Sequence, residues 1–357
     1  MLAAGVEWQP LLLVPPGGRG GVFRPLVGRM PVRVSGISQP AGVSSGSWAS
    51  LFGAAGRLAI QSLATHLDPA FRSADVVDAN TARSAAYGAL AAHLSRVRFV
   101  IHLRDFTDLE SFGRFGYALM TRLALPRADG LVANSRATLE SASHFLRPDA
   151  VTAVIPSASG LSRTTPAPRS GPLRVGMLAR IDPWKGQALL LEAFAAAFPD
   201  GDEQLELAGG APFGHDEYLS ELRSLSAQLG IEARVSFLGH VDDIPARLAQ
   251  WDIAVQASLR PEPLGQNVLQ YLAAGRATVV ADEGGPTEWV VHEVNGLRFA
   301  PRDAASLAAS LQRLAADPEL RARLAAGAPD TPGLLSDREV ADAHAAFYAE
   351  VLGRPRP

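Results

Sequence analysis

Short, β-branched apolar runs alternate with longer Ala/Leu-rich segments of helical periodicity from one end of the chain to the other, and few folds satisfy that pattern. It is typical of βα units whose strands form parallel sheets. In the first half the expected strands are 11–14, 32–34, 76–78, 98–103 and 130–133. The expected helices there are 48–64, 82–95, 111–125 and 136–145, the last capped by Ser135.

A break in the pattern divides the chain. Residues 156–172 read PSASGLSRTTPAPRSGP, where proline, serine and glycine mark a linker. Beyond it the expected strands are 173–178, 204–208, 235–238, 253–255 and 277–281. Because 357 residues are about twice the usual length of one domain, two domains are expected. We therefore predict an α/β protein with doubly wound domains at 1–157 and 172–335, and a final helix within 336–357 that packs back on the first domain.

Composition excludes several kinds of function. The net charge of −3 provides no basic face for a nucleic-acid backbone, so no nucleic-acid partner is expected. The absence of cysteine excludes disulfides, thiolate nucleophiles and zinc–thiolate sites, and is consistent with a reducing cytoplasm. The sequence shows neither a signal-peptide pattern nor an apolar run of about 18 residues, so we expect a soluble, cytoplasmic protein.

Arg180 and Lys185 form the first candidate site. Both follow the expected strand 173–178 and precede a helical segment, so they lie at the carboxyl edge of a sheet. A helix amino terminus beside two cations is suited to a diphosphate, because its N–H groups and dipole add to the charges. Two solvated loop cations are the commoner alternative. Against it, Lys185 is the only lysine among 33 basic residues, and every other one is arginine.

The segment 260–275, RPEPLGQNVLQYLAAG, repeats the arrangement of strand end, tight loop and helix. Gly265 permits close backbone approach, and the N–H groups of Gln266 and Asn267 open the helix toward an anion. Glu262 precedes this helix and can accept hydrogen bonds from sugar hydroxyls, and Gln270 lies one turn further in. Considered alone, Glu262 is more often an exposed loop carboxylate than a ligand.

Together these segments resemble the signature of glycosyltransferase family 4, whose members are retaining enzymes of the GT-B fold. The resemblance extends over nearly the whole chain and is strongest over 173–301. Further agreements, in the same order, are LAGG at 207–210, FLGHV at 237–241, GGPTEWV at 284–290 and NGL at 295–297. The resemblance implies two facing Rossmann-like domains, of which the first binds the acceptor and the second binds a nucleotide-sugar donor.

The resemblance also implies roles for single residues. Arg180 and Lys185 hold the donor diphosphate and Glu262 contacts the transferred sugar, so these three are expected catalytic residues. The expected donor-binding residues are Arg180, Lys185, Gly239, Val241, Glu262, Leu264, Gly265, Gln266 and Gln270. No metal or other cofactor is expected, since the sequence has no clustered Asp/His set suited to a divalent ion. The implied reaction moves a sugar to a saccharide, lipid-linked or small-molecule acceptor, in bacterial polysaccharide or glycoconjugate synthesis.

Two positions depart from the family pattern. Residue 270 is glutamine where the family has the glutamate that holds the nucleotide ribose. A neutral hydrogen bond in place of a charged one weakens donor binding by roughly tenfold. In the first domain, Arg104 stands where the family has a histidine beside the transferred sugar, and His102 precedes it by two residues. Both face one side of an extended strand, so both are candidate catalytic residues, although a histidine in an apolar strand is more often a core residue.

Three other features give weaker expectations. Residues 2–15 match the family's second strand, so this sequence is expected to lack the family's first βα unit, through either a misplaced start codon or a shortened first domain. Asn80 with Thr81, and Asn134 with Ser135, end first-domain strands, where they either touch ligand or cap helices. One aromatic set with two arginines either packs internally or makes weak peripheral contact with a membrane, and it comprises Phe112, Phe115, Tyr117, Met120, Arg114 and Arg122.

Two alternatives remain on the same fold. A nucleotide-sugar epimerase needs the diphosphate clamp but no acceptor. A catalytically impaired sugar-nucleotide-binding homologue is favoured by Gln270 and by the missing first unit. Donor hydrolysis or transfer excludes the binder, and release of an epimerised nucleotide sugar without transfer favours the epimerase.

Overall fold

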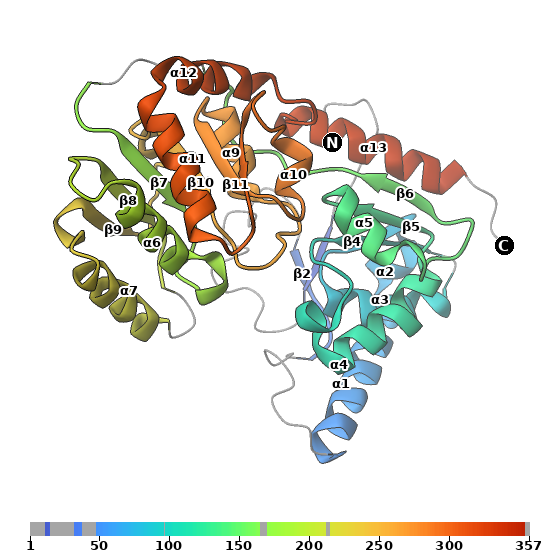
Figure 1. The fold of residues 1–357 in the computed structure, drawn as a ribbon. Coiled ribbons are helices and arrows are strands. Elements are labelled where there is room, and N and C mark those ends of the chain that lie inside the picture. The colour runs from blue at the N-terminus through green and yellow to red at the C-terminus, as the bar shows by residue number, and fades with distance from the viewer. Residues whose placement is uncertain are drawn as a thin grey trace. The chain divides into compact units, whose positions relative to one another are not determined.

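The computed structural model describes residues 11–14, 32–37, 48–95, 97–164, 170–211 and 215–353. The chain forms two compact units. Unit 1 comprises Met1–Ile155 with Ala341–Pro357, and unit 2 comprises Pro156–Val340. Each contains parallel β-sheet with helices packed against it (Figure 1), so the expected α/β class is confirmed. Residues 1–10 lie outside the described ranges, and with them most of the segment on which the expectation of a missing first βα unit rests.

The described strands of unit 1 are parallel and form two sheets. One pairs β1 (Leu12–Val14) with β2 (Val32–Val34), and the other has the order β3-β4-β5-β6. The four strands of the larger sheet are β3 (Val76–Ala79), β4 (Arg98–Leu103), β5 (Gly130–Ala133) and β6 (Val151–Val154). The strands predicted at 98–103 and 130–133 are confirmed residue for residue. β6 was not predicted, because this edge strand is short and keeps two of its four side chains exposed.

Helices of unit 1 follow the predicted pattern with one interruption. They are α1 (Trp48–Leu67), α2 (Pro69–Ser73), α3 (Ala82–His93), α4 (Leu109–Leu119), the π-helical η3 (Met120–Ala124), η4 (Leu125–Arg127), α5 (Arg136–Ser143) and the larger part of α13 (Asp337–Gly353). Ser135 caps α5 by accepting a hydrogen bond from the Thr138 N–H at 3.0 Å. The single helix predicted over 111–125 is wrong. Gly113 has φ 64° inside α4, a conformation that favours glycine, and it breaks the helical path there.

The carboxyl-terminal part of α13 packs on the larger sheet of unit 1. Phe347 and Val351 lie directly against Gly130 in β5, where an added Cβ would be 2.8 Å from Phe347 Cζ and 2.9 Å from Val351 Cγ2. The Tyr348 hydroxyl donates to Asp78 Oδ2 in β3. Glycine at position 130 thus allows the helix to lie close against the strand.

Unit 2 has one sheet of six parallel strands. Its order is β12-β11-β10-β7-β8-β9, so the chain starts at the centre, builds one half and then crosses to build the other. The strands are β7 (Arg174–Leu178), β8 (Gln204–Ala208), β9 (Val235–Gly239), β10 (Ile253–Gln256), β11 (Ala277–Ala281) and β12 (Gly296–Phe299). The strand order therefore reverses between β7 and β10. Ligands of such sheets bind outside the carboxyl ends of the strands at this switch point.

Helices cover both faces of this sheet. They are η5 (Pro183–Lys185), α6 (Gln187–Ala197), α7 (Asp216–Gln228), η6 (Glu232–Arg234), α8 (Ile244–Leu248), α9 (Gln266–Ala273), α10 (Pro286–Trp289), α11 (Ala304–Ala316), α12 (Pro318–Gly327) and η7 (Ala328–Asp330). Val255 in β10 packs into a core with α6, α7, α11 and α12, whereas its neighbour Ala254 packs into a core with α8 and α9. Successive strand residues thus face opposite layers, as in a doubly wound fold.

Candidate active site

The switch point of unit 2 brings two loops into backbone contact. One follows β7 and the other follows β10, the two strands between which the order reverses. Gly186 has φ 77°, and an added Cβ would be 1.8 Å from the Ala257 carbonyl oxygen. The Leu259 N–H donates to the Trp184 carbonyl at 2.8 Å. The two segments singled out in the sequence therefore form one site.

Lys185 and Glu262 meet across these loops. Lys185 Nζ is 2.6 Å from Glu262 Oε1, and the Ser258 hydroxyl donates to the same oxygen at 2.6 Å. Burial lowers the pKa of the ammonium, and the nearby Glu262 carboxylate opposes that effect. Glu262 is only 6% exposed, so the interpretation of an exposed loop carboxylate is wrong. Lys185, with 17% of its side chain exposed, is likewise no solvated loop cation.

Arg180 lies on the solvent side of this pair. Its Nε is 3.1 Å from Asp182 Oδ2, and 46% of its side chain is exposed. Asp182 belongs to the same loop, so this ion pair holds the Arg180 guanidinium beside the loop that carries Lys185. Two cations of different exposure therefore occupy the carboxyl edge of the sheet, Lys185 largely buried and Arg180 about half exposed.

The two helices that start at these loops have open amino termini. α6 and α9 begin after Gly186 and Gly265, both in left-handed conformation, and neither helix has a side-chain cap. In contrast, several other described helices are capped by a side chain, at Asp68, Thr81, Asp108, Ser135, Asp243, Asp303 and Asp317. Uncapped N–H groups beside Lys185 suit an anion, because the helix dipole favours negative charge there.

Two side chains to which the sequence analysis gave no role, those of Asn267 and Tyr271, hold α9 against β7. The Tyr271 hydroxyl accepts the Leu178 N–H at 2.7 Å, and Asn267 Nδ2 donates to the Leu178 carbonyl at 3.1 Å. Complete burial raises the pKa of Tyr271 far above its ordinary value. Their spacing of four residues in the NVLQY run, which places both on one helix face, is the signal that identifies them.

The remaining predicted donor-binding residues have different surroundings. Leu264 is buried in the core, whereas Gln266 is exposed and its Nε2 donates to the Ala158 carbonyl at 2.8 Å. Gln270 is half-buried one turn into α9. Gly239 ends β9 with φ 67°, and Val241 packs partly against the Trp251 core.

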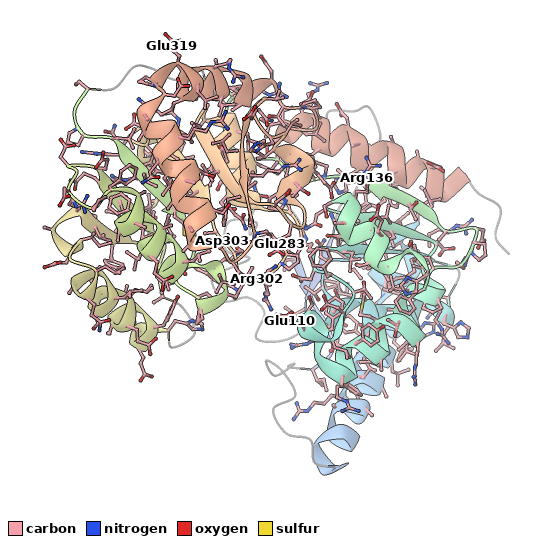
Figure 2. The ribbon with its side chains drawn as sticks, in the orientation of Figure 1. Glu110, Arg136, Glu283, Arg302, Asp303 and Glu319 are labelled. Atoms are coloured by element: carbon pink, nitrogen blue, oxygen red, sulfur yellow. The ribbon has the colours of Figure 1, made fainter. Side chains whose placement is uncertain are left out.

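The GG pair in GGPTEWV supports the Glu262 loop from behind. An added Cβ on Gly284 would be 2.6 Å from the Glu262 carbonyl oxygen, and the Gly285 N–H donates to that oxygen at 2.8 Å. Beside this pair, Arg302 Nη1 bonds to Glu283 Oε1 at 2.7 Å and to the Leu259 carbonyl at 3.0 Å, and Arg302 and Glu283 lie close together in Figure 2. The loop that follows β10 is therefore held by the backbone of Gly284 and Gly285 and by the side chain of Arg302.

The two candidates of unit 1 are in different environments. The His102 ring lies 5.1 Å from the His344 ring of α13, and its Nδ1 is 3.8 Å from Asp78 Oδ2. Burial, with the charges of Arg104 and His344, lowers the pKa of His102 to about 3, so the ring is neutral. These contacts favour a core role for His102. Arg104 is exposed at the end of β4, where its Nε and Nη2 donate to Asn80 Oδ1 at 3.1 and 3.0 Å.

Other expected residues of unit 1 have structural roles. Asn134 Nδ2 donates to the Arg104 carbonyl at 3.0 Å, and Thr81 caps α3. Met120 is buried, Phe112 packs against the core, and Tyr117 meets Phe145 edge to face, which agrees with an internal packing face. None of the described helices is long and apolar enough to cross a bilayer. Within the described residues no cluster of three His, Cys, Asp or Glu side chains suits a metal ion.

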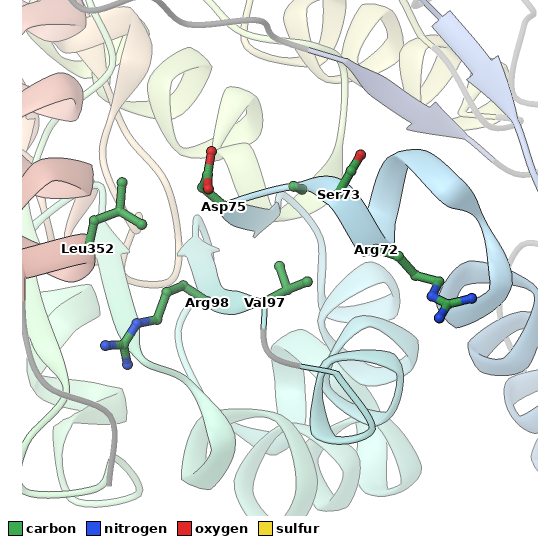
Figure 3. A pocket seen from close by; sticks show the side chains of 7 residues that line it. Arg72, Ser73, Asp75, Val97, Arg98 and Leu352 are labelled. Atoms are coloured by element: carbon green, nitrogen blue, oxygen red, sulfur yellow. The ribbon is translucent and has the colours of Figure 1, made fainter.

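A pocket of about 360 Å³ lies in unit 1 at the amino ends of the sheet strands, opposite to the carboxyl edge that carries Arg104. It is lined by Arg72, Ser73, Ala74, Asp75, Val97, Arg98 and Leu352 (Figure 3). These residues adjoin the amino ends of β3 and β4. Since ligands of parallel sheets bind at the carboxyl ends, this pocket is separate from the candidate site.

Comparison with known families agrees with the fold. A model described as Glycosyl transferases group 1 matches residues 162–331, and one described as Glycosyl transferase 4-like domain matches residues 2–158. The two matches adjoin and together span both units. The chain belongs to glycosyltransferase family 4, of the GT-B fold.

Individual relatives and solved structures are similar to this chain to different extents. Lipopolysaccharide core biosynthesis glycosyltransferase LpsE of Rhizobium meliloti (strain 1021) is 34% identical over 137 residues, a match that covers 38% of this chain and 40% of LpsE. Anabaena Alr3699/HepE, solved in complex with UDP and glucose, superposes with a TM-score of 0.76 at 28% identity over 95% of this chain and 91% of that chain. Sucrose-phosphate synthase from Thermosynechococcus elongatus shares the fold, with a TM-score of 0.78 at 18% identity over 98% and 90% of the chains.

Proposed function

We propose that this chain is a retaining glycosyltransferase that takes a sugar from a nucleoside diphosphate donor bound to unit 2. The observation that carries the proposal is the meeting of Lys185, Arg180 and Glu262 at the switch point of the unit 2 sheet, beside two uncapped helix termini. Cations and free N–H groups suit a diphosphate, and a buried carboxylate that already accepts two hydrogen bonds suits a polyhydroxylated sugar.

The proposed chemistry follows from these charges. As the bond between the anomeric carbon and the diphosphate breaks, negative charge develops on the leaving oxygens. Lys185 and Arg180 stabilise that charge more in the transition state than in the bound donor, which is the condition for catalysis. Glu262 holds the sugar, and no metal takes part. Retention of configuration and metal independence rest on the family resemblance.

The substrate classes are proposed from the relatives. HepE was solved with UDP and glucose and also with UDP-glucose, which supports a UDP-sugar donor here. LpsE is named for lipopolysaccharide core biosynthesis, which supports a saccharide or lipid-linked acceptor in bacterial polysaccharide or glycoconjugate synthesis. The proposed place of action is the cytoplasm, with weak peripheral membrane contact when the acceptor is lipid-linked.

Unit 1 is proposed to bind the acceptor through Arg104. Its guanidinium is exposed at the carboxyl edge of the sheet and is oriented by a neutral amide, Asn80, so its charge stays available. His102, the other candidate of this strand, is proposed to act through packing beneath α13, because it is buried and neutral. Arg104→Gln should then weaken acceptor binding without changing donor binding.

The experiment that tests the donor site measures thermal unfolding against a panel of nucleoside diphosphates and their sugars. A ligand at a hundred times its dissociation constant raises the free energy of unfolding by about 2.7 kcal/mol. We expect one nucleotide to give a selective increase that is lost in Lys185→Ala. The same substitution should reduce turnover at least roughly a hundredfold, equivalent to about 2.7 kcal/mol.

A matched control separates the site from general stability. Lys185→Ala leaves the Glu262 carboxylate buried without its cation, so each variant is compared with its own ligand-free unfolding temperature. Arg174→Ala removes a cation at the other end of β7 and should leave the ligand response intact. Near-normal turnover in Lys185→Ala would overturn the assignment. Release of an epimerised nucleotide sugar without transfer would instead identify an epimerase.

A further inference from the structure

Trp184 lies between the cations of the proposed donor site. Lys185 Nζ is 3.7 Å from the centroid of the Trp184 ring, and Arg260 Cζ is 4.2 Å from it. Arg180 Cζ is more distant, at 5.9 Å. An indole attracts cations over its face within about 6 Å of the centroid, because the ring carries a negative quadrupole there. One side chain thus contacts all three cations of the two loops.

Backbone contacts join the residue that carries this ring to the second loop. Trp184 is in η5, whose end is followed by Gly186 packed on the Ala257 carbonyl. The Trp184 carbonyl accepts the Leu259 N–H at 2.8 Å, and Leu259 precedes Arg260. The backbone that carries the ring is therefore tied to both loops.

We propose that Trp184 is a positioning residue for the donor diphosphate, and that its ring holds Lys185 and Arg260 together as a joint anion-binding pair. The inference rests on the proposed function and adds Arg260 to the diphosphate site. When the diphosphate binds, the Lys185 ammonium donates hydrogen bonds to both Glu262 and a phosphate oxygen. The ring then keeps the ammonium at the position where it can reach the phosphate. Arg260, on the same ring, supplies a guanidinium to the same diphosphate.

The ring also acts on the protonation of Lys185. The charged groups that act on the ammonium are Glu262 and Asp182, which favour its charged form, and Arg180, which disfavours it. The indole face is a further group that favours the charged form. Without it the pKa of Lys185, already lowered by burial, falls further. Binding of an anion by the ammonium is then lost at a lower pH.

The test measures binding of UDP, or of whichever nucleoside diphosphate the panel selects, by calorimetry in three proteins: wild type, Trp184→Phe and Trp184→Leu. Leucine keeps an apolar side chain without the π face, and phenylalanine keeps a smaller π face. We expect Trp184→Leu to weaken binding about tenfold and Trp184→Phe to recover most of that loss. From neutral pH into the alkaline range, affinity should fall at lower pH in Trp184→Leu than in wild type.

A second cation–aromatic contact in unit 2 provides the control. Phe237→Leu removes a similar contact between Arg223 and an aromatic ring, at 4.7 Å, and should leave binding and its pH dependence unchanged. Equal loss in the leucine and phenylalanine variants, or an unchanged alkaline limb in Trp184→Leu, would show a packing role and overturn the inference. If Arg260→Gln binds the nucleoside diphosphate as tightly as wild type does, Arg260 does not contribute to diphosphate binding. If wild type binds no nucleotide at all, the proposed function fails.

Discussion

His102 illustrates how burial sets the protonation of a single residue. Only 10% of its side chain is exposed, and the charges of Arg104 and His344 add to the desolvation that lowers its pKa from 6.5 to about 3. Between about pH 3 and pH 6.5, His102 is therefore neutral in the folded chain and protonated in the unfolded chain. Asp78 beside it has a pKa raised by burial, and that effect on stability has the opposite sign.

The stability of the folded chain should depend on pH through His102. Because the His102 pKa is depressed, its contribution is complete above pH 6.5 and is lost as the pH falls toward 3. The expected slope is about 1.4 kcal/mol per pH unit for one proton. His102→Gln should flatten the slope measured by urea unfolding in mildly acidic buffers. His240→Gln is the control, since that side chain is 81% exposed, and an equal effect of both would refute the assignment.

Among elements, α13 shows how a helix depends on the strand beneath it. Phe347 and Val351 reach the backbone of β5 only because residue 130 has no side chain. Buried aromatic and aliphatic side chains of the helix then complete the core of unit 1, and Tyr348 bonds to Asp78. A close-packed contact of this kind tolerates little added volume.

Gly130→Ala should therefore destabilise the chain by about 1–3 kcal/mol, because the new methyl group overpacks the contact with α13. Gly56→Ala is the matched control. An added Cβ at Gly56 in α1 meets nothing within 4 Å, so the same chemical change should stabilise the chain by roughly 0.5–1 kcal/mol through helix propensity. Chemical denaturation measures both, and effects of the same sign would contradict the packing argument.

For the whole molecule, the two units divide the site residues unequally. Arg180, Lys185, Trp184, Glu262 and the uncapped amino termini of α6 and α9 belong to unit 2, which has its own six-stranded sheet and cores on both faces. Arg104 and Asn80 belong to unit 1. The chain passes between units near Ile155 and again within α13.

A fragment spanning Pro156–Val340 should accordingly fold and bind the nucleoside diphosphate with an affinity of the same order as the full chain, but transfer no sugar. Circular dichroism checks the fold, and calorimetry checks binding. The same fragment with Lys185→Ala should be folded and unable to bind. A folded wild-type fragment without affinity, beside a full chain that binds, would show that unit 1 contributes to the donor site.

Much of this arrangement could be predicted from sequence, and the remainder depends on contacts between distant residues. Strands such as β8 and β11 are apolar runs between turn residues, and they lie where predicted. Arg180, Lys185 and Glu262 were placed at a sheet edge by their position after strands. The 2.6 Å contact of Lys185 with Glu262 joins residues 77 apart, and the break at Gly113 depends on one backbone angle. Periodicity reports neither.

The single lysine gives the chain an unusual chemical handle. Lys185 carries the only side-chain primary amine in the sequence. Its lowered pKa leaves more of the unprotonated, nucleophilic form near neutral pH than an ordinary surface lysine has. An amine-selective acylating reagent therefore has one side-chain target, inside the proposed donor site. The extent of labelling would report occupancy of that site directly, with the α-amino group as an internal reference.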